Sequence, residues 1–420
     1  ATGAISFDGG ALRLGAQDAN TGFSLADRPV TVNIGGGKLY SYKNSGSYTF
    51  GQTIAGAGEL KTSGGEGWGS PTFVFTASND VASVRMQNGT HNIDLRHPHA
   101  AGVGVLALDG GYAYRTIRLK NDASVTYAMA GITAPCNFTI DVKQTTAAGV
   151  DQTLAIPAFT MTPQDQKDQL TVTGANGYRL QINSVTLVSG WTDKQLTLNP
   201  TTAPLTVGNM NIQKGQIFLN GTHADNRVTG VISGDNGGGN VLGNIIKEST
   251  STWTLEGANT YYGRTTVNAG ALVVNGSIPS ANGVIVNVGG ILGGTGTVAI
   301  ATVKAGGAIA PGPGAGVGTM KFGALTLEEG AALNIELGAP ATSDRVAVNG
   351  DLALDGVVNV AAAEGFGVGY YPIATYTGSL ADNGLEVGTT PDPGLVYSVR
   401  AGGGLVTLRV NAPGTAIVVR

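Results

Sequence analysis

The sequence contains few of the residues that cross-link a small domain or carry chemistry. Its single cysteine, Cys136, cannot form an internal disulfide, so the stability of the chain must come from a core. We expect Cys136 to be a buried, small apolar residue, because free cysteines are usually buried. Aromatic residues make up 6% and charged residues 12% of the chain. So few aromatic residues argue against a broad sugar-binding strip of stacked rings.

Two classes of partner are excluded by what the sequence lacks. The net charge is −4, and no run of Lys and Arg forms a nucleic-acid surface. No apolar stretch approaches the roughly 20 residues of a membrane-spanning helix. The chain opens at Ala1 without an initiator Met, which is typical of a mature end after a signal peptide has been removed. We therefore expect an exported protein.

The residues that are abundant favour an all-β fold. The chain has 67 glycines, and hydrophobic residues make up 42% of it. Val, Ile and Thr are frequent, and such β-branched residues suit strands, whereas Gly and Asn suit the corners between strands. The sequence therefore predicts many short strands joined by tight corners.

Short units of similar order repeat along the chain, which is the signature of a repeat architecture. Each unit is a short alternating strand, a corner of Gly or Asn-Gly, and a second short strand. The units are 265–276, 284–294, 301–311, 324–337 and 345–356, with similar ones at 5–14, 30–40, 104–114 and 210–221. One unit cannot bury its inward face alone, so stacking of successive units predicts a parallel β-solenoid.

The spacing of the units supports this interpretation. The residues before five successive corners are Val267, Val286, Val303, Leu327 and Val348, and the steps between them are similar but not equal. A solenoid tolerates such variation, because insertions bulge out at the corners. Turns of about 20 residues would stack inward Val, Ile and Leu side chains into columns. The alternative is a set of antiparallel sandwiches, in which the same corners would be hairpin tips.

Residues 113–205 differ from the rest of the chain, with 5 glycines against 62 elsewhere. Polar residues occupy every second position, as in a sheet with one solvated face. This stretch is either a set of broader solenoid turns or an inserted antiparallel sheet or sandwich. The predicted organisation is N-terminal turns (1–112), a glycine-poor segment (113–205) and C-terminal turns (206–420).

The segment 230–297 resembles a known repeat. Ile232–Gly234, Lys247, Thr254–Tyr261 and Gly263–Leu272 follow the order I-S-G, L-x-K, T-L-x-G-x-N-T-Y and G-x-T-T-V-x-x-G-x-L. This order resembles the passenger-associated transport repeat, also called the autotransporter-associated β-strand repeat. The resemblance covers about residues 230 to 410, with weaker echoes in 1–112.

The resemblance implies a right-handed parallel β-helix that is exported through the bacterial envelope. It also implies residence outside the cell or at the outer cell surface. Passengers of this class continue into a membrane β-barrel, and the sequence shows no such series of strands before Arg420. We therefore expect a cleaved passenger or a secreted relative, with no membrane insertion by this chain.

The sequence offers no pattern for catalysis, for a metal or for a cofactor. It contains neither a nucleophile-elbow nor a phosphate-binding motif. Glu328 and Glu329 are adjacent, so on a strand they would point to opposite sides and could not act as a pair. His97 and His99 lack neighbouring ligands that would complete a metal site. We predict that the chain is not an enzyme and holds no metal or cofactor.

Two sets of residues are weak candidates for contacts. Paired tyrosines that flank corners could stack on sugars: Tyr112, Tyr114, Tyr261 and Tyr262. The ends of a solenoid expose strand edges that pair readily with other copies. The candidates for such assembly are Ile5, Phe7, Ile417, Val418 and Val419.

The predicted function is that of a secreted or cell-surface structural or adhesive β-solenoid, with copies joining end to end into extracellular filaments. The expected partners are further copies of the chain, glycans, or a host or matrix surface. The first alternative is a carbohydrate-binding surface module that uses residues 113–205. The second is a β-helix enzyme that cleaves polysaccharides.

Overall fold

The computed structural model describes residues 3–14, 23–24, 28–41, 45–64, 70–87, 89–110, 115–164, 167–189, 194–235, 243–312, 314 and 316–414. Contacts divide the chain into unit 1 (residues 1–226) and unit 2 (residues 227–420), which are treated separately below. The described residues of both units form strands and contain no helix. Accordingly, no helix able to cross a membrane is found among them.

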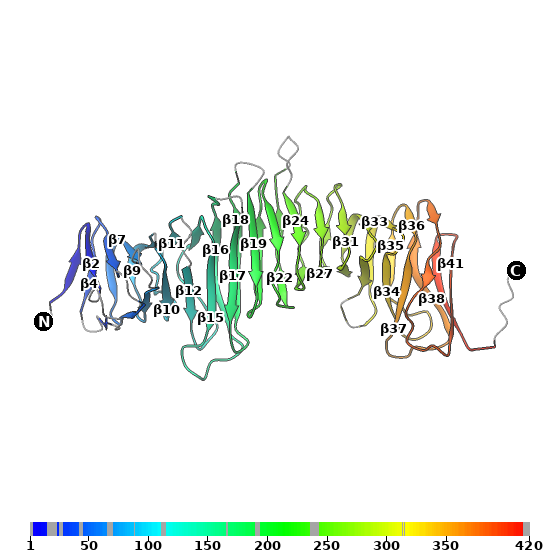
Figure 1. Cartoon of the computed structure of the whole chain (residues 1–420), viewed down its shortest axis with the longest axis horizontal. Coiled ribbons are helices and arrows are strands. Elements are labelled where there is room, and N and C mark those ends of the chain that lie inside the picture. Colours follow the sequence, from blue (N-terminus) through cyan, green and yellow to red (C-terminus); the bar gives the residue numbers. More distant parts are fainter. Residues whose placement is uncertain are drawn as a thin grey trace. The chain divides into compact units, whose positions relative to one another are not determined.

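Unit 1 is a parallel β-solenoid of two sheets (Figure 1). Its first sheet contains β1 (Ile5–Phe7), β2 (Gly10–Arg13), β4 (Val30–Val32), β5 (Gly37–Tyr40), β7 (Ile54–Ser63), β9 (Asp80–Met86), β11 (Val105–Leu108), β13 (Val125–Thr126), β14 (Gly131–Ala134), β16 (Thr153–Met161), β18 (Arg179–Leu187) and β20 (Leu205–Asn211). Its second sheet contains β3 (Phe23–Ser24), β6 (Ser47–Phe50), β8 (Thr72–Phe75), β10 (His91–Leu95), β12 (Arg115–Lys120), β15 (Phe138–Lys143), β17 (Lys167–Gly174), β19 (Gln195–Pro200) and β21 (Gln216–Leu219). The fold class predicted from the sequence is confirmed.

Most turns of unit 1 are longer than the sequence analysis predicted. Ile5 pairs with Val30 and Val30 with Ile54, so each of these turns takes about 25 residues. Leu106 pairs with Ile132 and Ile132 with Phe159, in turns that are slightly longer still. The expected turn of about 20 residues is therefore wrong for most of this unit, because its corners and strands contain more residues than the Gly-rich repeats.

The glycine-poor stretch 113–205 lies within unit 1, and its strands pair in parallel. In the second sheet β12 pairs with β15, β15 with β17 and β17 with β19. In the first sheet β16 pairs with β18 from Thr153–Arg179 to Met161–Leu187. The described part of this stretch thus consists of broad turns of the solenoid. The predicted boundaries at 112 and 205 both fall inside unit 1.

The core of unit 1 is built from columns of apolar side chains, one side chain from each turn. One column in the first sheet consists of Val84, Leu106, Ile132, Phe159, Val185 and Met210, which are paired in that order and buried. Burial of one such side chain contributes about 1.5–3 kcal/mol. Strand alternation sends the intervening residues outward, so the columns also fix which side chains face solvent.

Unit 2 is also a parallel β-solenoid through most of its length. Its first sheet contains β22 (Asn226–Val228, starting at the last residue of unit 1), β23 (Ile232–Ser233), β25 (Thr252–Leu255), β27 (Gly270–Val274), β30 (Gly290–Gly294), β32 (Ala308–Pro311), β34 (Ala332–Leu337), β37 (Val357–Ala362) and β40 (Glu386–Val387). Its second sheet contains β24 (Asn244–Lys247), β26 (Thr265–Val267), β28 (Ser277–Ile278), β29 (Val284–Val286), β31 (Thr297–Val303), β33 (Thr319–Leu327), β35 (Arg345–Val348), β36 (Leu352–Leu354), β38 (Gly369–Tyr376), β39 (Leu380–Asp382), β41 (Val396–Gly402) and β42 (Leu405–Asn411).

Most of the residue alignment made from the sequence is confirmed in unit 2. Val267 pairs with Val286, Val286 with Val303, and Val303 with Leu327. The last step, from Leu327 to Val348, is wrong, because Val348 pairs with Phe322 instead. The long strand β33 pairs with both β35 and β36, so the corner between those two strands shifts the register of the repeat.

Short turns in unit 2 bring glycine corners into close contact. Ile291 pairs with Ala308, which makes this turn about two thirds as long as the turn from Leu106 to Ile132 in unit 1. A Cβ atom added to Gly276 would lie 2.0 Å from the carbonyl oxygen of Gly257, and one added to Gly296 would lie 2.2 Å from that of Gly276. The stacked corners therefore approach too closely for any side chain.

A buried lysine closes one of these corners. The side chain of Lys247 is fully buried at the end of β24. Its Nζ donates hydrogen bonds to the carbonyl oxygens of Glu248 at 2.5 Å, Ser249 at 2.8 Å and Ala269 at 3.0 Å. Three acceptors use all three protons of an ammonium group. Lys247 thus ties its own corner to the corner of the following turn.

The parallel pattern changes in the last described strands of unit 2. β42 pairs with β38 in antiparallel orientation, and β41 pairs with β42 in the same way. The sequence analysis considered an antiparallel segment at 113–205, whereas the antiparallel strand pairs among the described residues lie at 369–411.

Candidate functional site

Unit 1 has a groove on the outward face of its first sheet. Its volume is about 530 Å³. We call it the Arg85 groove. Its lining residues are Glu59, Ser83, Arg85, Val105, Ala107, Leu108, Asp109, Gly110, Thr133, Pro135, Thr162 and Gln164. They come from β7, β9, β11, β14 and the segments that follow β11, β14 and β16, so the groove crosses several turns of the solenoid.

Small outward side chains form the floor of the groove. Ala107 pairs with Arg85 on one neighbouring strand and with Thr133 on the other. The short side chain of Ala107 therefore leaves a depression between the longer side chains of Arg85 and Thr133. Val105, on the same face of β11 as Ala107, supplies further apolar atoms, so the floor is apolar and the walls carry the polar groups.

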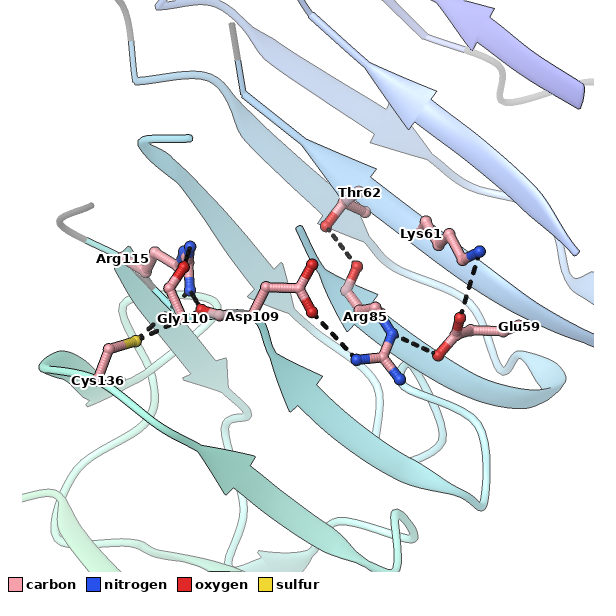
Figure 2. A network of polar contacts seen from close by, with 8 residues as sticks. All are labelled: Glu59, Lys61, Thr62, Arg85, Asp109, Gly110, Arg115 and Cys136. Atoms are coloured by element: carbon pink, nitrogen blue, oxygen red, sulfur yellow. Dashed lines mark hydrogen bonds and ion pairs between the residues drawn. The ribbon is translucent and has the colours of Figure 1, made fainter. Parts of the chain in front are cut away.

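An alternating series of charges forms one wall of the groove (Figure 2). Lys61 Nζ lies 3.6 Å from Glu59 Oε2, and Arg85 Nε donates to Glu59 Oε1 at 2.8 Å. Arg85 Nη1 donates to Asp109 Oδ1 at 3.1 Å. These hydrogen bonds, first that with Asp109, raise the pKa of the Arg85 guanidinium. The four groups carry two positive and two negative charges, so the wall has no net charge.

A β-bulge in β7 precedes Glu59, which pairs with Ser83 and so lies diagonal to Arg85, the partner of Lys61. The pairing between β7 and β9 shifts register between Gly56 and Glu59, where Gly56 pairs with Val81 and Glu59 with Ser83. Gly56 adopts a φ of 123°, and a Cβ atom there would lie 2.1 Å from the carbonyl oxygen of Val32. A bulge redirects the side chains that follow it. Glycine at this position therefore contributes to the position of Glu59 in the wall.

A buried arginine supports the groove from beneath. The side chain of Arg115 is 2% exposed, and burial lowers the pKa of its guanidinium. Its Nη1 donates to the carbonyl oxygen of Asp109, and its Nη2 donates to that of Gly110 at 3.4 Å (Figure 2). Arg115 thus holds the backbone at the residue whose carboxylate binds Arg85.

Cys136 lies next to this guanidinium, with its Sγ 3.5 Å from Arg115 Nη1. The thiol is buried, as the sequence analysis predicted. Burial raises its pKa, which outweighs the opposite effect of Arg115. A protonated, buried thiol is a poor nucleophile. Cys136 therefore packs beneath the groove without supplying chemistry to it.

The opposite wall carries an amide and a hydroxyl group. The lining residues there are Thr162 and Gln164. A Cβ atom on Gly110 would lie 1.8 Å from Gln164 Oε1, so glycine at 110 is what lets this amide lie against the end of β11. Lys194 Nζ donates to the carbonyl oxygen of Gln164 at 3.1 Å and holds the segment in place.

A second groove lies on the outward face of the second sheet in unit 2. Its volume is about 440 Å³. Its residues include Thr297, Lys321, Ala347 and Thr375, which are in register across β31, β33, β35 and β38. As in the Arg85 groove, an alanine forms the floor: Ala347 lies between the polar residues Lys321 and Thr375. It lacks the alternating acid and base pairs of the Arg85 groove.

Of the tyrosines predicted from the sequence, the two that the structure describes, Tyr261 and Tyr262, line neither groove. Tyr112 and Tyr114 lie outside the described residues. Tyr261 is 2% exposed, and its hydroxyl lies 2.6 Å from Thr265 Oγ1, so its ring packs inside unit 2 and is inaccessible to a ligand. Tyr262 is 49% exposed and remains available for stacking.

The residues proposed for assembly are only partly described. Ile417, Val418 and Val419 lie outside the described residues. Ile5 pairs with Val30 and Phe7 with Val32 in parallel orientation. Phe7 is buried, whereas Ile5 is partly exposed.

The histidines and the acidic pair considered for chemistry are separate from the grooves. His97 and His99 have ring centroids 5.9 Å apart, and no group of three metal-ligating side chains occurs in the described part of the chain. His91 is buried, and burial lowers its pKa to about 4. The sequence analysis assumed that Glu328 and Glu329 lie on a strand. In the structure they follow β33 and lie in the turn after it. Glu328 binds Lys304 at 2.9 Å.

The Arg85 groove was missed in the sequence although a signal existed. Arg85 is separated from Glu59 by 26 positions and from Asp109 by 24. Arg85 pairs with Lys61 and Ala107, so Glu59 and Asp109 each lie two positions from its partner in the neighbouring turn, on the same face. Acidic and basic residues one turn apart fall side by side on the outward face. A search with turns of about 20 residues does not bring them into register.

Comparison with known proteins gives matches to parts of the chain. The family model described as passenger-associated-transport-repeat matches residues 245–274. The chain is 41% identical over 105 residues to the adhesin BmaC autotransporter of Brucella suis biovar 1, covering 23% of this chain and 3% of that protein. It is 34% identical over 118 residues to an extracellular serine protease of Serratia marcescens, covering 28% of this chain and 11% of that protein. The chain therefore spans a small fraction of the length of these relatives.

Proposed function

We propose that this parallel β-solenoid, which carries an autotransporter passenger repeat, belongs to a secreted or cell-surface protein with an adhesive role. The observation that carries the proposal is the repeat at 245–274, which covers the strand pairs β24–β26 and β25–β27 and the buried Lys247. The relative from Brucella suis is named an adhesin, and we extend only that class to this chain.

The location follows from the same repeat. We propose that the chain resides outside the cell or on the outer surface of a bacterium, with its signal peptide removed. Antibody against the full chain should label intact producing cells or detect the chain in the medium. A chain found only in the cytoplasmic fraction of intact cells would exclude this location.

The physical basis of adhesion is a rigid, outward-facing surface. Columns of buried side chains hold each turn in place, so the outward residues form a fixed pattern with a period of about 4.8 Å. A preformed surface binds without a further loss of conformational entropy. The Arg85 groove is a recess on such a surface in unit 1, and we propose it as the contact site.

Adhesion can be measured with beads that carry the purified full chain. Coated beads should remain on glycan-coated or matrix-protein-coated surfaces under flow, whereas beads that carry urea-unfolded chain should wash off. Equal retention of folded and unfolded chain, or no retention above that of uncoated beads, would argue against an adhesive role.

We further propose that copies of the chain associate end to end into filaments. One contact would be the edge of β1 opposite to the edge that pairs with β4. A strand edge offers unpaired backbone groups to another chain. Electron microscopy and sedimentation of the full chain at increasing concentration test this, and Ile5→Pro should abolish the filaments. A chain that stays monomeric at high concentration contradicts association while leaving adhesion intact.

Proteolysis is not extended from the Serratia relative to this chain. The match covers 11% of that protein. The lining of the Arg85 groove contains Ser83 but no histidine that could act as its base. The groove is therefore better suited to binding than to nucleophilic catalysis.

A further inference from the structure

We propose that the Arg85 groove binds a neutral oligosaccharide, lying across the turns of unit 1. The inference rests on the proposed adhesive function and names the class of ligand for its contact site. Four properties of the groove support it: its charge balance, its hydrogen-bonding groups, its period and its apolar floor.

The charge balance of the groove selects against charged ligands. Arg85 is bound by two carboxylates, from Glu59 and Asp109, and Glu59 also lies near Lys61. An acidic sugar would meet these carboxylates beside the guanidinium, and a basic ligand would meet Arg85 and Lys61. Like charges brought together in this way weaken binding. The wall therefore favours a ligand without net charge.

The polar groups of the walls suit a ligand with many hydroxyl groups. Arg85 uses Nε and Nη1 on the carboxylates, which leaves Nη2 available as a donor. Asp109 and Gln164 supply acceptors, and Ser83 and Thr133 supply hydroxyl groups that both donate and accept. A sugar hydroxyl also donates and accepts, so it can bridge a donor and an acceptor on the wall. The ion pairs of Arg85 with Glu59 and Asp109 hold these three side chains in position before a ligand binds.

The period of the solenoid sets the spacing of the binding groups. Successive strands lie about 4.8 Å apart, so the turns from β7 to the segment after β16 span about 19 Å. The strand spacing is close to the length of one pyranose residue. A chain of a few sugar residues that crosses the strands would thus meet one set of polar groups per residue.

The floor supplies the apolar contact that a sugar ring requires. Val105, Ala107 and Pro135 present aliphatic carbon atoms between the polar walls, and the C–H face of a pyranose can pack on them. An extended peptide is a poorer fit, because peptides usually gain their main-chain hydrogen bonds at a sheet edge. The groove lies on a sheet face, where the backbone groups are already paired.

The test uses the full chain and a panel of immobilised oligosaccharides. The neutral probes are tetrasaccharides of glucose, mannose, galactose and N-acetylglucosamine, and the acidic probes are tetragalacturonate and sialyllactose. Extended matrix-derived peptides form a third set. We expect binding to at least one neutral probe, with about a tenfold or greater loss in Arg85→Gln and in Asp109→Asn, because each substitution removes a hydrogen bond to a charged group.

A steric variant tests the same site independently of charge. Ala107→Trp fills the floor and should also reduce binding about tenfold or more. Its matched control is Ala347→Trp, which places the same bulk on the floor of the groove in unit 2 and should leave binding unchanged. The matched control for Arg85→Gln is Arg227→Gln, which removes a surface pair with Glu256 away from the groove. Unfolding temperatures measured for all variants identify any that fail to fold.

Each outcome decides the inference. Binding to acidic probes alone, to peptides alone or to no probe overturns it, as does neutral-sugar binding that survives Ala107→Trp in a folded chain. If beads coated with the chain adhere but the adhesion is unaffected by Ala107→Trp, the groove inference fails and the adhesive function stands. If coated beads adhere to no surface, the proposed function itself fails.

Discussion

Units 1 and 2 differ in the length of their solenoid turns, although both contain close glycine contacts and a buried cation that binds backbone carbonyl groups. In unit 1 the turn from Leu106 to Ile132 is long, and buried polar side chains such as Arg115 bind the backbone of its corners. In unit 2 the turn from Ile291 to Ala308 is about two thirds as long, and glycines allow the corners to touch. Longer turns leave room for side chains on the outward face, and this is where the charged groove lies.

The largest expected effect concerns the corner lysine of unit 2. Lys247→Met leaves three buried carbonyl groups without their donor, so the free energy of unfolding should fall by about 4 kcal/mol. Urea unfolding followed by the fluorescence of Trp253, which is buried in the same unit, measures the change. The control is Lys304→Met, because Lys304 pairs with Glu328 on the exposed surface and should cost under about 1 kcal/mol. Equal losses in the two variants would contradict the role of Lys247.

The glycine corners of unit 2 should tolerate no methyl group. Gly276→Ala places a Cβ atom against the carbonyl oxygen of Gly257 and should destabilise the chain by about 3 kcal/mol. Gly367→Ala is the control, because a Cβ atom there meets nothing within 4 Å. Thermal unfolding of both variants gives the comparison. A stable Gly276→Ala variant would mean that the corners can separate without loss.

The two units should respond to acid in opposite directions. Burial lowers the pKa of His91 to about 4, below the ordinary value of 6.5, so the unfolded chain takes up the proton first and unit 1 loses stability as the pH falls. Burial raises the pKa of Asp344 to about 6, above the ordinary value of 3.8, so the folded state takes up the proton first and unit 2 gains stability. Between pH 6.5 and 4.5 each effect is about 2 kcal/mol.

Hydrogen exchange resolved by peptide can follow the two units separately at these two pH values, after correction for the intrinsic exchange rates. His91→Gln should remove the acid loss in unit 1, and Asp344→Asn should remove the acid gain in unit 2. Parallel responses of the two units in the unmodified chain would rule out the burial effects as the cause.

The smallest expected effect on stability comes from the groove itself. Arg85 is 38% exposed, so Arg85→Gln should change the free energy of unfolding by less than about 1 kcal/mol. Arg115→Met should cost more, because Arg115 is buried and binds two carbonyl groups. Urea unfolding of both variants tests whether the wall of the groove serves binding and its buried support serves folding. A larger loss for Arg85→Gln would assign the wall a structural role.

Much of the fold could be predicted from the sequence because glycine marks the corners. The pairs Val267–Val286 and Val286–Val303 follow from the short, regular turns of unit 2. The length of the turns in unit 1 could not be predicted, since residues 113–205 contain only 5 glycines and the glycines before them lie within strands as well as at corners. Strand alternation alone does not fix where a turn closes. Without the turn length, the sequence does not predict which outward side chains of neighbouring turns lie side by side.

The candidate site illustrates this limit. Glu59, Arg85 and Asp109 become neighbours only when the longer turns of unit 1 are assumed, and a β-bulge adds a further shift at Glu59. The tyrosines were selected for their residue type, and Tyr261 proved to be buried because its hydroxyl finds an internal partner in Thr265. Residue type alone therefore does not show which side chains face solvent.

One adhesion measurement joins the groove to the function. Beads coated with the full chain, with its Ala107→Trp variant or with its Ala347→Trp variant would be passed over surfaces that carry the neutral tetrasaccharides. Retention should be equal for the unmodified chain and Ala347→Trp, and about tenfold lower for Ala107→Trp. Equal retention of all three, or retention of none, would contradict adhesion through the Arg85 groove.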